Sequence, residues 1–169
     1  MAYSKPEPLR DKHNCDEFSC GREELDTWLK RFARHAENAG SARTFVTTAD
    51  GERVVGYYAL TVAEVAPADA TARLLKGQPS GAAVPVALLA RLAVDQEHQG
   101  GGVGRSLLQD ALLRTQQVSE EVGIRALVTH AMTAEARSWY EQFGFEQSPT
   151  DPLHLVLLIK DLRELISRS

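Results

Sequence analysis

A run of glycines in the middle of the chain is the sequence feature best suited to bind a ligand. The segment reads Gln99-Gly100-Gly101-Gly102-Val103-Gly104-Arg105-Ser106. Because glycine has no Cβ, main-chain N–H groups in such a segment can approach an anion closely. A helix that starts there adds unpaired N–H donors and the positive end of its dipole. The segment therefore predicts a site for a phosphate or pyrophosphate.

The spacing of the glycines excludes two common nucleotide-binding loops. A Walker loop ends in Gly-Lys-Ser or Gly-Lys-Thr and has another glycine five residues before that last glycine. Here the end reads Gly104-Arg105-Ser106, and the earlier position holds Gln99. A dinucleotide loop requires Gly-x-Gly-x-x-Gly, and its third glycine position would fall on Arg105 or Leu107. A simple turn would also explain the glycines, although not the elements on either side.

The elements that must position this segment are predicted from hydrophobic periodicity. Asp50-Gly51 is typical of a hairpin turn, and Val84–Val94 is an apolar run typical of a buried strand. Helices are predicted over residues 21–37, 106–121, 133–143 and 161–169, and strands over 44–48, 53–65, 84–94, 126–130 and 153–159. Thr133 is suited to cap the third helix, and Gly144 to end it. This order predicts a mixed α/β sheet layered with helices.

Two motifs resemble the GNAT N-acetyltransferases. Gln99-x-x-Gly102-x-Gly104 is similar to the family's Q/R-x-x-G-x-G/A motif, and Leu92-Ala93-Val94-Asp95 before it looks like the central strand. About 40 residues further on, Ala136, Tyr140 and Gly144-Phe145 are similar to its A-x-x-x-Y-x-x-x-G-F element. The resemblance implies one GNAT domain over residues 1–169, of the α/β (α+β) class. Its central sheet would be mixed, mostly antiparallel and flanked by helices.

The resemblance also implies acetyl-CoA as cosubstrate and assigns its contacts. Main-chain groups of Leu92, Ala93 and Val94 would bind the pantetheine arm. The N–H groups of Gln99–Gly104, with Arg105 and Ser106, would receive the pyrophosphate. In enzymes of this family a tyrosine at the position of Tyr140 protonates the coenzyme A sulfur. A phenol with a pKa of about 10 is protonated at neutral pH and can do so.

The sequence does not decide which residue would accept the proton of the amine. Glu64, Asp95 and His130 lie near the ends of predicted strands and are the candidates. The substrate ammonium can instead lose its proton to solvent before it binds. No metal is expected, because Cys15 and Cys20 lack the further ligands of a zinc site, and a structural or incidental role is predicted for these thiols.

The chain resembles one group within this family more closely, the TacT-like GNAT toxins of toxin–antitoxin modules. The resemblance is carried by Phe18–Leu29, Ser41–Val46 and Val55–Leu60, and it covers nearly the whole chain. It implies acetylation of the α-amino group of the amino acid on charged tRNA, which stops translation. It also implies a small ribbon-helix-helix antitoxin as partner and a possible homodimer.

The charge distribution bears on a tRNA acceptor. The net charge of −4 argues against nucleic-acid binding through overall charge. Basic residues nevertheless gather at Lys30, Arg31, Arg34 and Arg43, where they could contact the tRNA backbone. A solvated helix face is the alternative explanation.

Other acceptors and another class of protein remain possible from the sequence. The acceptor could be a small amine, an antibiotic or a protein amine, and the chain could be a non-catalytic acyl-CoA-binding module. No apolar run is long enough to span a membrane, and the N-terminus does not resemble a secretion signal, so a cytoplasmic protein is expected.

Overall fold

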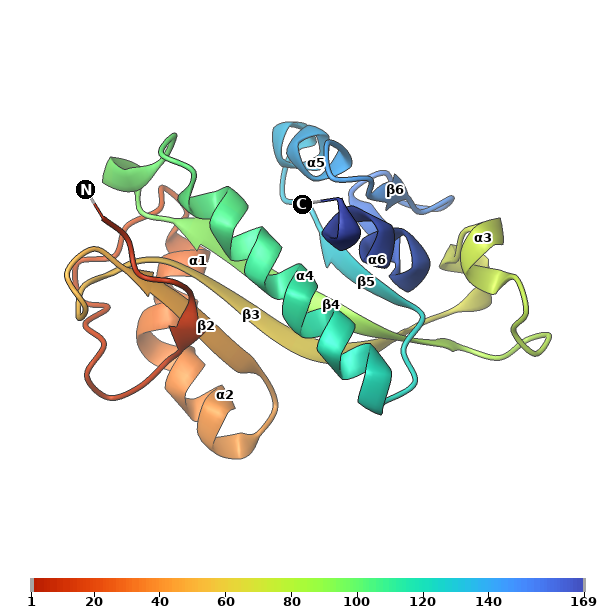
Figure 1. The fold of residues 1–169 in the computed structure, drawn as a ribbon, viewed down its shortest axis with the longest axis horizontal. Helices are drawn as coiled ribbons and strands as arrows, with labels where there is room; N and C mark the ends of the chain where they lie inside the picture. The colour runs from red at the N-terminus through yellow and green to blue at the C-terminus, as the bar shows by residue number, and fades with distance from the viewer. Residues whose placement is uncertain (1, 169) are drawn as a thin grey trace. The chain divides into compact units, whose positions relative to one another are not determined.

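A computed structural model describes residues 2–168 of the chain (Figure 1). The chain groups into two compact units. Unit 1 consists of the chain up to Thr61 together with Ala90–Ala111. Unit 2 consists of Val62–Leu89 together with the chain from Leu112 onward. The long strands β3 (Val54–Val65) and β4 (Val84–Val94) have residues in both units.

Seven strands form one sheet, in the order β1-β2-β3-β4-β5-β7-β6. The remaining strands are β1 (Glu7–Pro8), β2 (Arg43–Thr48), β5 (Ala126–His130), β6 (Glu146–Gln147) and β7 (His154–Leu158). Strands β4 and β5 are parallel, whereas β1/β2, β2/β3, β5/β7 and β6/β7 are antiparallel. The predicted mixed, mostly antiparallel sheet is confirmed. The two-residue strands β1 and β6 were not predicted.

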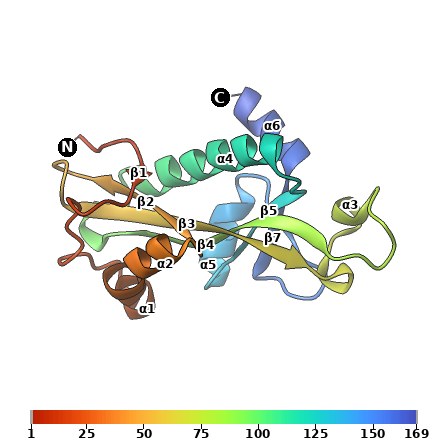
Figure 2. The ribbon, with the colours of Figure 1, turned by 90° about the horizontal axis from the view of Figure 1, so that it is seen from below.

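The helices of unit 1 cover both faces of its strands (Figure 2). On one face lie α1 (Glu23–Thr27), the π-helical turn η1 (Trp28–Phe32) and α2 (Ala33–Ala39), and on the other lies the start of α4 (Val103–Glu121). Leu29 and Ala33 pack with Phe18 and Tyr57 in the core of this unit. The helical segment predicted over residues 21–37 is thus confirmed, with a π turn in its middle.

The β2–β3 hairpin has the predicted turn. Gly51 has a φ of +90°, which is a conformation that favours glycine. Oδ1 of Asp50 accepts hydrogen bonds from the main-chain N–H groups of Glu52 (3.0 Å) and Arg53 (2.7 Å). These bonds stabilise the carboxylate and lower the pKa of Asp50.

Unit 2 contains η2 (Pro67–Asp69), α3 (Ala72–Leu75), α5 (Ala134–Glu141) and α6 (Ile159–Ser167). Figure 2 shows α5 and α6 on opposite faces of the strands of this unit. Thr133 caps α5 as predicted, because its hydroxyl accepts a hydrogen bond from the N–H of Ala136 at 3.0 Å. Helix α6 begins two residues earlier than predicted. Among residues 2–168, none of the helices combines the length and apolar content needed to cross a membrane.

Candidate active site

The glycine segment lies in unit 1 between the end of β4 and the start of α4. After β4 ends at Val94, a short 3₁₀ turn, η3 (Gln96–His98), leads into the glycines. Gly100 and Gly102 have φ values of +82° and +88°. A Cβ added at either would have no heavy atom of the protein within 4 Å, so the space beside both glycines is open to a ligand.

The start of α4 corrects the predicted boundary of this segment. The helix begins at Val103 and not at Ser106. The N–H groups of Val103, Gly104 and Arg105 therefore belong to the first helical turn, where N–H groups lack intrahelical acceptors. The open glycines and the helix start together suit a pyrophosphate, as the sequence predicts.

Two side chains hold this segment in place. Asp95 is 4% exposed, and its two oxygens accept hydrogen bonds from the N–H groups of Glu97 and Ser19, both at 3.0 Å. Nε2 of Gln99 donates to the carbonyls of Val94 (2.9 Å) and Cys20 (3.3 Å). The amide of Gln99 thus ties the segment to the end of β4 and to the N-terminal part of the chain.

Gly56 of β3 is a positioning residue that the sequence analysis missed. A Cβ at this position would lie 2.9 Å from Val103 Cγ1 and 2.9 Å from Leu107 Cδ1. Both side chains belong to the first turns of α4 and are buried. Glycine at position 56 therefore allows the start of α4 to pack closely against the sheet.

The strand residues predicted to bind pantetheine line the last part of β4. Ala93 is buried, whereas Leu92 and Val94 are half-buried. The Val94 carbonyl accepts the Gln99 amide, and the following N–H, of Asp95, donates to the Val55 carbonyl at 2.8 Å. The contacts of this strand with pantetheine stay predictions.

Tyr140 lies on α5 in unit 2 and is 7% exposed. Its ring makes edge contacts with Trp139 and Phe145, at 5.0 Å and 5.4 Å between ring centroids. Burial raises the pKa of Tyr140 to about 12, and a side-chain hydrogen bond with Thr129 offsets part of this rise. The phenol is therefore fully protonated at neutral pH, as a proton donor must be.

The sequence of this site matches a known family. Residues 40–147 match the model of the acetyltransferase (GNAT) domain, and this range contains both the glycine segment and Tyr140. The chain belongs to the GNAT acetyltransferase family. The expected family and fold are thereby confirmed.

Individual relatives resemble this GNAT chain over almost its full length. A tRNA-acetylating toxin of Mycobacterium tuberculosis (strain ATCC 25618 / H37Rv) is 48% identical over 164 residues, which cover 97% of each chain. A probable toxin TacT of Sinorhizobium fredii (strain NBRC 101917 / NGR234) is 30% identical, with 95% of this chain and 93% of that protein covered. A mutant of the toxin AtaT, solved with the C-terminus of the antitoxin AtaR and acetyl-CoA, shares the fold with a TM-score of 0.81 at 23% identity, covering 98% of each chain.

The three candidate bases of this GNAT domain differ in their exposure and in the contacts that they make within the protein. Asp95 uses both oxygens to accept main-chain N–H groups, which makes it a structural carboxylate. Glu64 is exposed near the end of β3. His130, exposed at the end of β5, stacks on His154 of β7 with 4.3 Å between ring centroids and 16° between ring planes.

The His130–His154 pair predicts that acid destabilises the fold. Burial first, and then His130, lower the pKa of His154 from its ordinary value of 6.5. A histidine with a lowered pKa binds fewer protons when the protein is folded. The stability is therefore full above about pH 6.5 and falls as the pH drops through the lowered pKa.

We expect His154→Gln to reduce the pH dependence of the free energy of unfolding between about pH 7 and pH 5. Urea unfolding at several pH values tests this, with the exposed His35→Gln as control, and parallel profiles for wild type and His154→Gln would contradict it.

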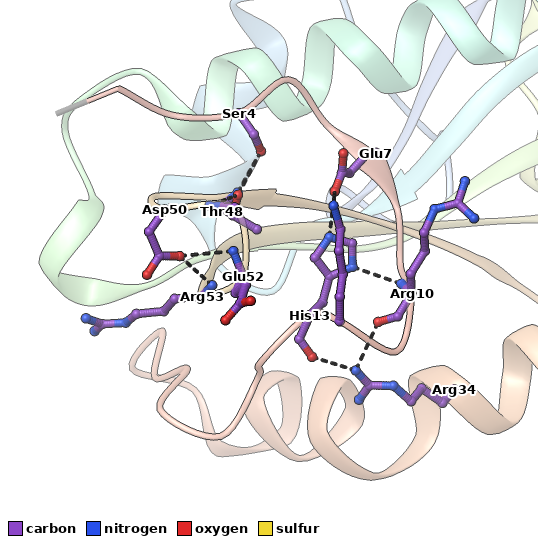
Figure 3. A network of polar contacts seen from close by, with 11 residues as sticks. Ser4, Glu7, Arg10, His13, Arg34, Thr48, Asp50, Glu52 and Arg53 are labelled. Atoms are coloured by element: carbon purple, nitrogen blue, oxygen red, sulfur yellow. Dashed lines mark hydrogen bonds and ion pairs between the residues drawn. The ribbon is translucent and has the colours of Figure 1, made fainter.

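The four cations predicted to meet tRNA have different surroundings. Arg34 donates to the main-chain carbonyls of His13 (2.7 Å) and Arg10 (3.3 Å), which holds α2 against the N-terminal segment (Figure 3). Arg43 is bonded to the carboxylate and the carbonyl of Glu37. The side chains of Lys30 and Arg31 are exposed and form no hydrogen bond or ion pair within residues 2–168.

The contacts of His13 in the N-terminal segment that binds Arg34 were not predicted from the sequence. His13 is 3% exposed, its Nδ1 accepts the N–H of Arg10 at 2.8 Å, and its Nε2 lies 2.6 Å from a carboxylate oxygen of Glu7 (Figure 3). Its signal was weak, because a lone histidine among charged residues also fits a solvated loop. These contacts hold together the N-terminal segment whose carbonyls accept the hydrogen bonds of Arg34.

A stack of three side chains beside β4, here called the ladder, was not predicted from the sequence either. The Arg91 guanidinium lies 4.3 Å from the centroid of the Trp28 ring, which stacks on Tyr57 at 6.0 Å. The hydroxyl of Tyr57 donates to the Leu25 carbonyl at 2.8 Å. The only signal was Arg91 itself, a charge within an apolar strand. The ladder connects β4 to the π turn that begins at Trp28.

Both cysteines are free thiols. Cys15 is 4% exposed and packs in the core of unit 1, and burial raises the pKa of its thiol. Burial and Asp26 raise the pKa of Cys20 to about 11. Neither side chain is thus a ready nucleophile at neutral pH, which agrees with the structural or incidental role predicted for them.

Proposed function

We propose that this chain transfers the acetyl group of acetyl-CoA to the α-amino group of aminoacyl-tRNA and so blocks translation. The observation that carries the proposal is the 48% identity, over 97% of the chain, with a tRNA-acetylating toxin. The open glycines at the start of α4 support acetyl-CoA as the donor, because they suit its pyrophosphate. We further propose that residues 1–169 act as one N-acetyltransferase domain.

In this proposal the chain's residues divide the work between binding and proton transfer. Main-chain groups of Leu92, Ala93 and Val94 bind the pantetheine arm. The N–H groups of Gln99–Gly104, with Arg105 and Ser106, bind the pyrophosphate. These contacts place the thioester for attack by the amine, and positioning of this kind supplies much of the rate of an acyl transfer.

Tyr140 completes the reaction as general acid. The amine nitrogen attacks the thioester carbonyl carbon, the C–S bond breaks as the amide bond forms, and the phenol gives its proton to the departing thiolate. The amine loses one proton to solvent, from which the phenolate is then reprotonated. Because an aminoacyl ester lowers the amine's pKa below that of a lysine side chain, no strong base is required.

The proposal extends to partners and place of action. Lys30 and Arg31, which are exposed, contact the tRNA backbone, while Arg34 and Arg43 hold the helix that presents them. A ribbon-helix-helix antitoxin neutralises the enzyme, which acts in the cytoplasm as a homodimer. The antitoxin of AtaT is the structural parallel for such a partner.

The decisive experiment is incubation with labelled acetyl-CoA and total charged tRNA. We expect label on the aminoacyl-tRNA and none on deacylated tRNA, because only the charged form has an α-amino group. Free amines and total cell protein are added in parallel reactions. Label on those acceptors alone would replace the proposed function by acetylation of a small amine or a protein.

A further inference from the structure

A cavity in unit 2 is lined mainly by cations. Its volume is about 590 Å³, and five of its lining residues are Arg73, Lys76, Arg125, Lys160 and Arg163. The other lining residues are aliphatic, and no carboxylate is among them. These residues come from α3 and the residue after it, from the two residues before β5, and from the β7–α6 junction, all within unit 2. The volume is in the usual range of ligand sites, about 300–1,000 Å³.

Arg125 gives the cavity a rigid wall. Its N–H donates to the Pro85 carbonyl (2.9 Å), and its carbonyl accepts the N–H of Ile159 (3.0 Å). Its guanidinium Nη2 donates to the Lys76 carbonyl at 2.8 Å, which ties the end of α3 to β5. Its Nε is buried and has no hydrogen-bond partner in the part of the chain that the structure describes. The guanidinium of Arg125 is therefore held in one position in the wall of the cavity.

The positive charge of the cavity is only partly balanced. Arg73 forms ion pairs with Glu146 and, through two 2.9 Å contacts, with Asp161. By contrast, Lys76, Lys160 and Arg163 are exposed and have no side-chain hydrogen bond or ion pair among residues 2–168. Like charges around one cavity repel each other, and a bound polyanion would relieve this repulsion.

We propose that this cavity binds phosphodiester groups of the tRNA acceptor. The inference rests on the proposed function and adds a second region of backbone contact to the exposed pair Lys30 and Arg31. A protein of net charge −4 must bind tRNA through local clusters of cations. Here several ammonium and guanidinium groups surround one hollow, and guanidinium and ammonium groups are the usual donors to phosphate oxygens.

The test compares two double variants that remove the same charge. Lys160→Ala/Arg163→Ala removes two cations of the cavity, whereas Lys5→Ala/Arg10→Ala removes two exposed cations of unit 1. The kcat/KM for acetylation of aminoacyl-tRNA is measured from about 50 to 200 mM salt. We expect the cavity variant to lower kcat/KM and to reduce the slope of log(kcat/KM) against log[salt] by about 1 for each lost phosphate contact. The unit 1 variant keeps the wild-type slope.

Two further arms separate the possible causes. With an aminoacylated CCA trinucleotide, which lacks the distant backbone, the cavity variant should match wild type. The charge-conserving variant Lys160→Arg/Arg163→Lys should retain most of the salt slope. An unchanged slope in the cavity variant, while wild type acetylates tRNA, overturns the inference and leaves the proposed function intact.

The remaining outcomes are also decisive. If wild type acetylates no aminoacyl-tRNA, the proposed function itself fails, and the inference fails with it. If the cavity variant keeps its tRNA kinetics but loses inhibition by the antitoxin, the cavity is a protein-binding site and the inference is overturned.

Discussion

Replacing Tyr140 by phenylalanine is expected to slow acetyl transfer strongly while acetyl-CoA binding persists. General acid catalysis contributes typically about 10²–10⁴-fold to a rate, so kcat should fall by about that factor. The phenol is 7% exposed, and burial raises its pKa to about 12, so the proton is present throughout the neutral range. The measurement is the initial rate with charged tRNA, beside the Kd for acetyl-CoA from titration calorimetry.

The substitution leaves the packing of this site largely intact. Phenylalanine retains the edge contacts with Trp139 and Phe145, and only the hydroxyl and its bond with Thr129 are lost. Tyr57→Phe is the matched control, because it removes another buried hydroxyl, bonded to the Leu25 carbonyl. We expect this control to lose about 1 kcal/mol of stability and to keep its kcat. Equal losses of kcat in the two variants would show that Tyr140 acts through the fold and not as an acid.

Much of the fold is encoded in short-range patterns. The apolar runs and the Asp50-Gly51 turn identify β2, β3 and β4, and the Thr133 cap identifies the start of α5. The glycine spacing predicts the anion site without any tertiary information, since an open backbone before a helix is a local property. The starts of α4 and α6 were placed three and two residues too late in the chain. Gly104 and Arg105 were assigned to the loop, although the packing of Val103 and Leu107 against Gly56 supports a helix there.

The features that were missed depend on contacts between distant parts of the chain. The π turn at Trp28–Phe32 has no periodicity that a short window distinguishes from an α-helix, and Trp28 in it is stacked on Tyr57 and Arg91. The strands β1 and β6 are two residues long and exist through their pairing partners. The residues that line the cationic cavity are spread over positions 73 to 163, so no cluster in the sequence predicts it.

The predicted tRNA surface shows the same limit. Lys30, Arg31, Arg34 and Arg43 are close in sequence and basic, which is all that a charge pattern can register. The guanidinium groups of Arg34 and Arg43 bind acceptors within the chain, and only a structure reveals those acceptors. A charge pattern therefore predicts where cations are but not which of them are available to a partner.

Replacing Gly102 by alanine is expected to weaken acetyl-CoA binding with little effect on the chemical step. The φ of +88° at this position strains an alanine, and its Cβ would project into the space open to the pyrophosphate. A loss of about 1.4 kcal/mol in binding corresponds to about a tenfold higher Kd, and we expect at least that. The Kd for acetyl-CoA is measured by calorimetry and the kcat at saturating acetyl-CoA.

Gly51→Ala separates backbone strain from loss of the ligand contact. Gly51 has a nearly equal φ of +90°, and a Cβ there would also meet no atom within 4 Å, but it lies in the β2–β3 turn. Both variants should lose a similar free energy of unfolding, about 1–3 kcal/mol, because both strain one residue. Only Gly102→Ala should lose affinity for acetyl-CoA. An equal rise of Kd in both variants would mean that strain alone weakens binding, and an unchanged Kd in Gly102→Ala would place the pyrophosphate away from this glycine.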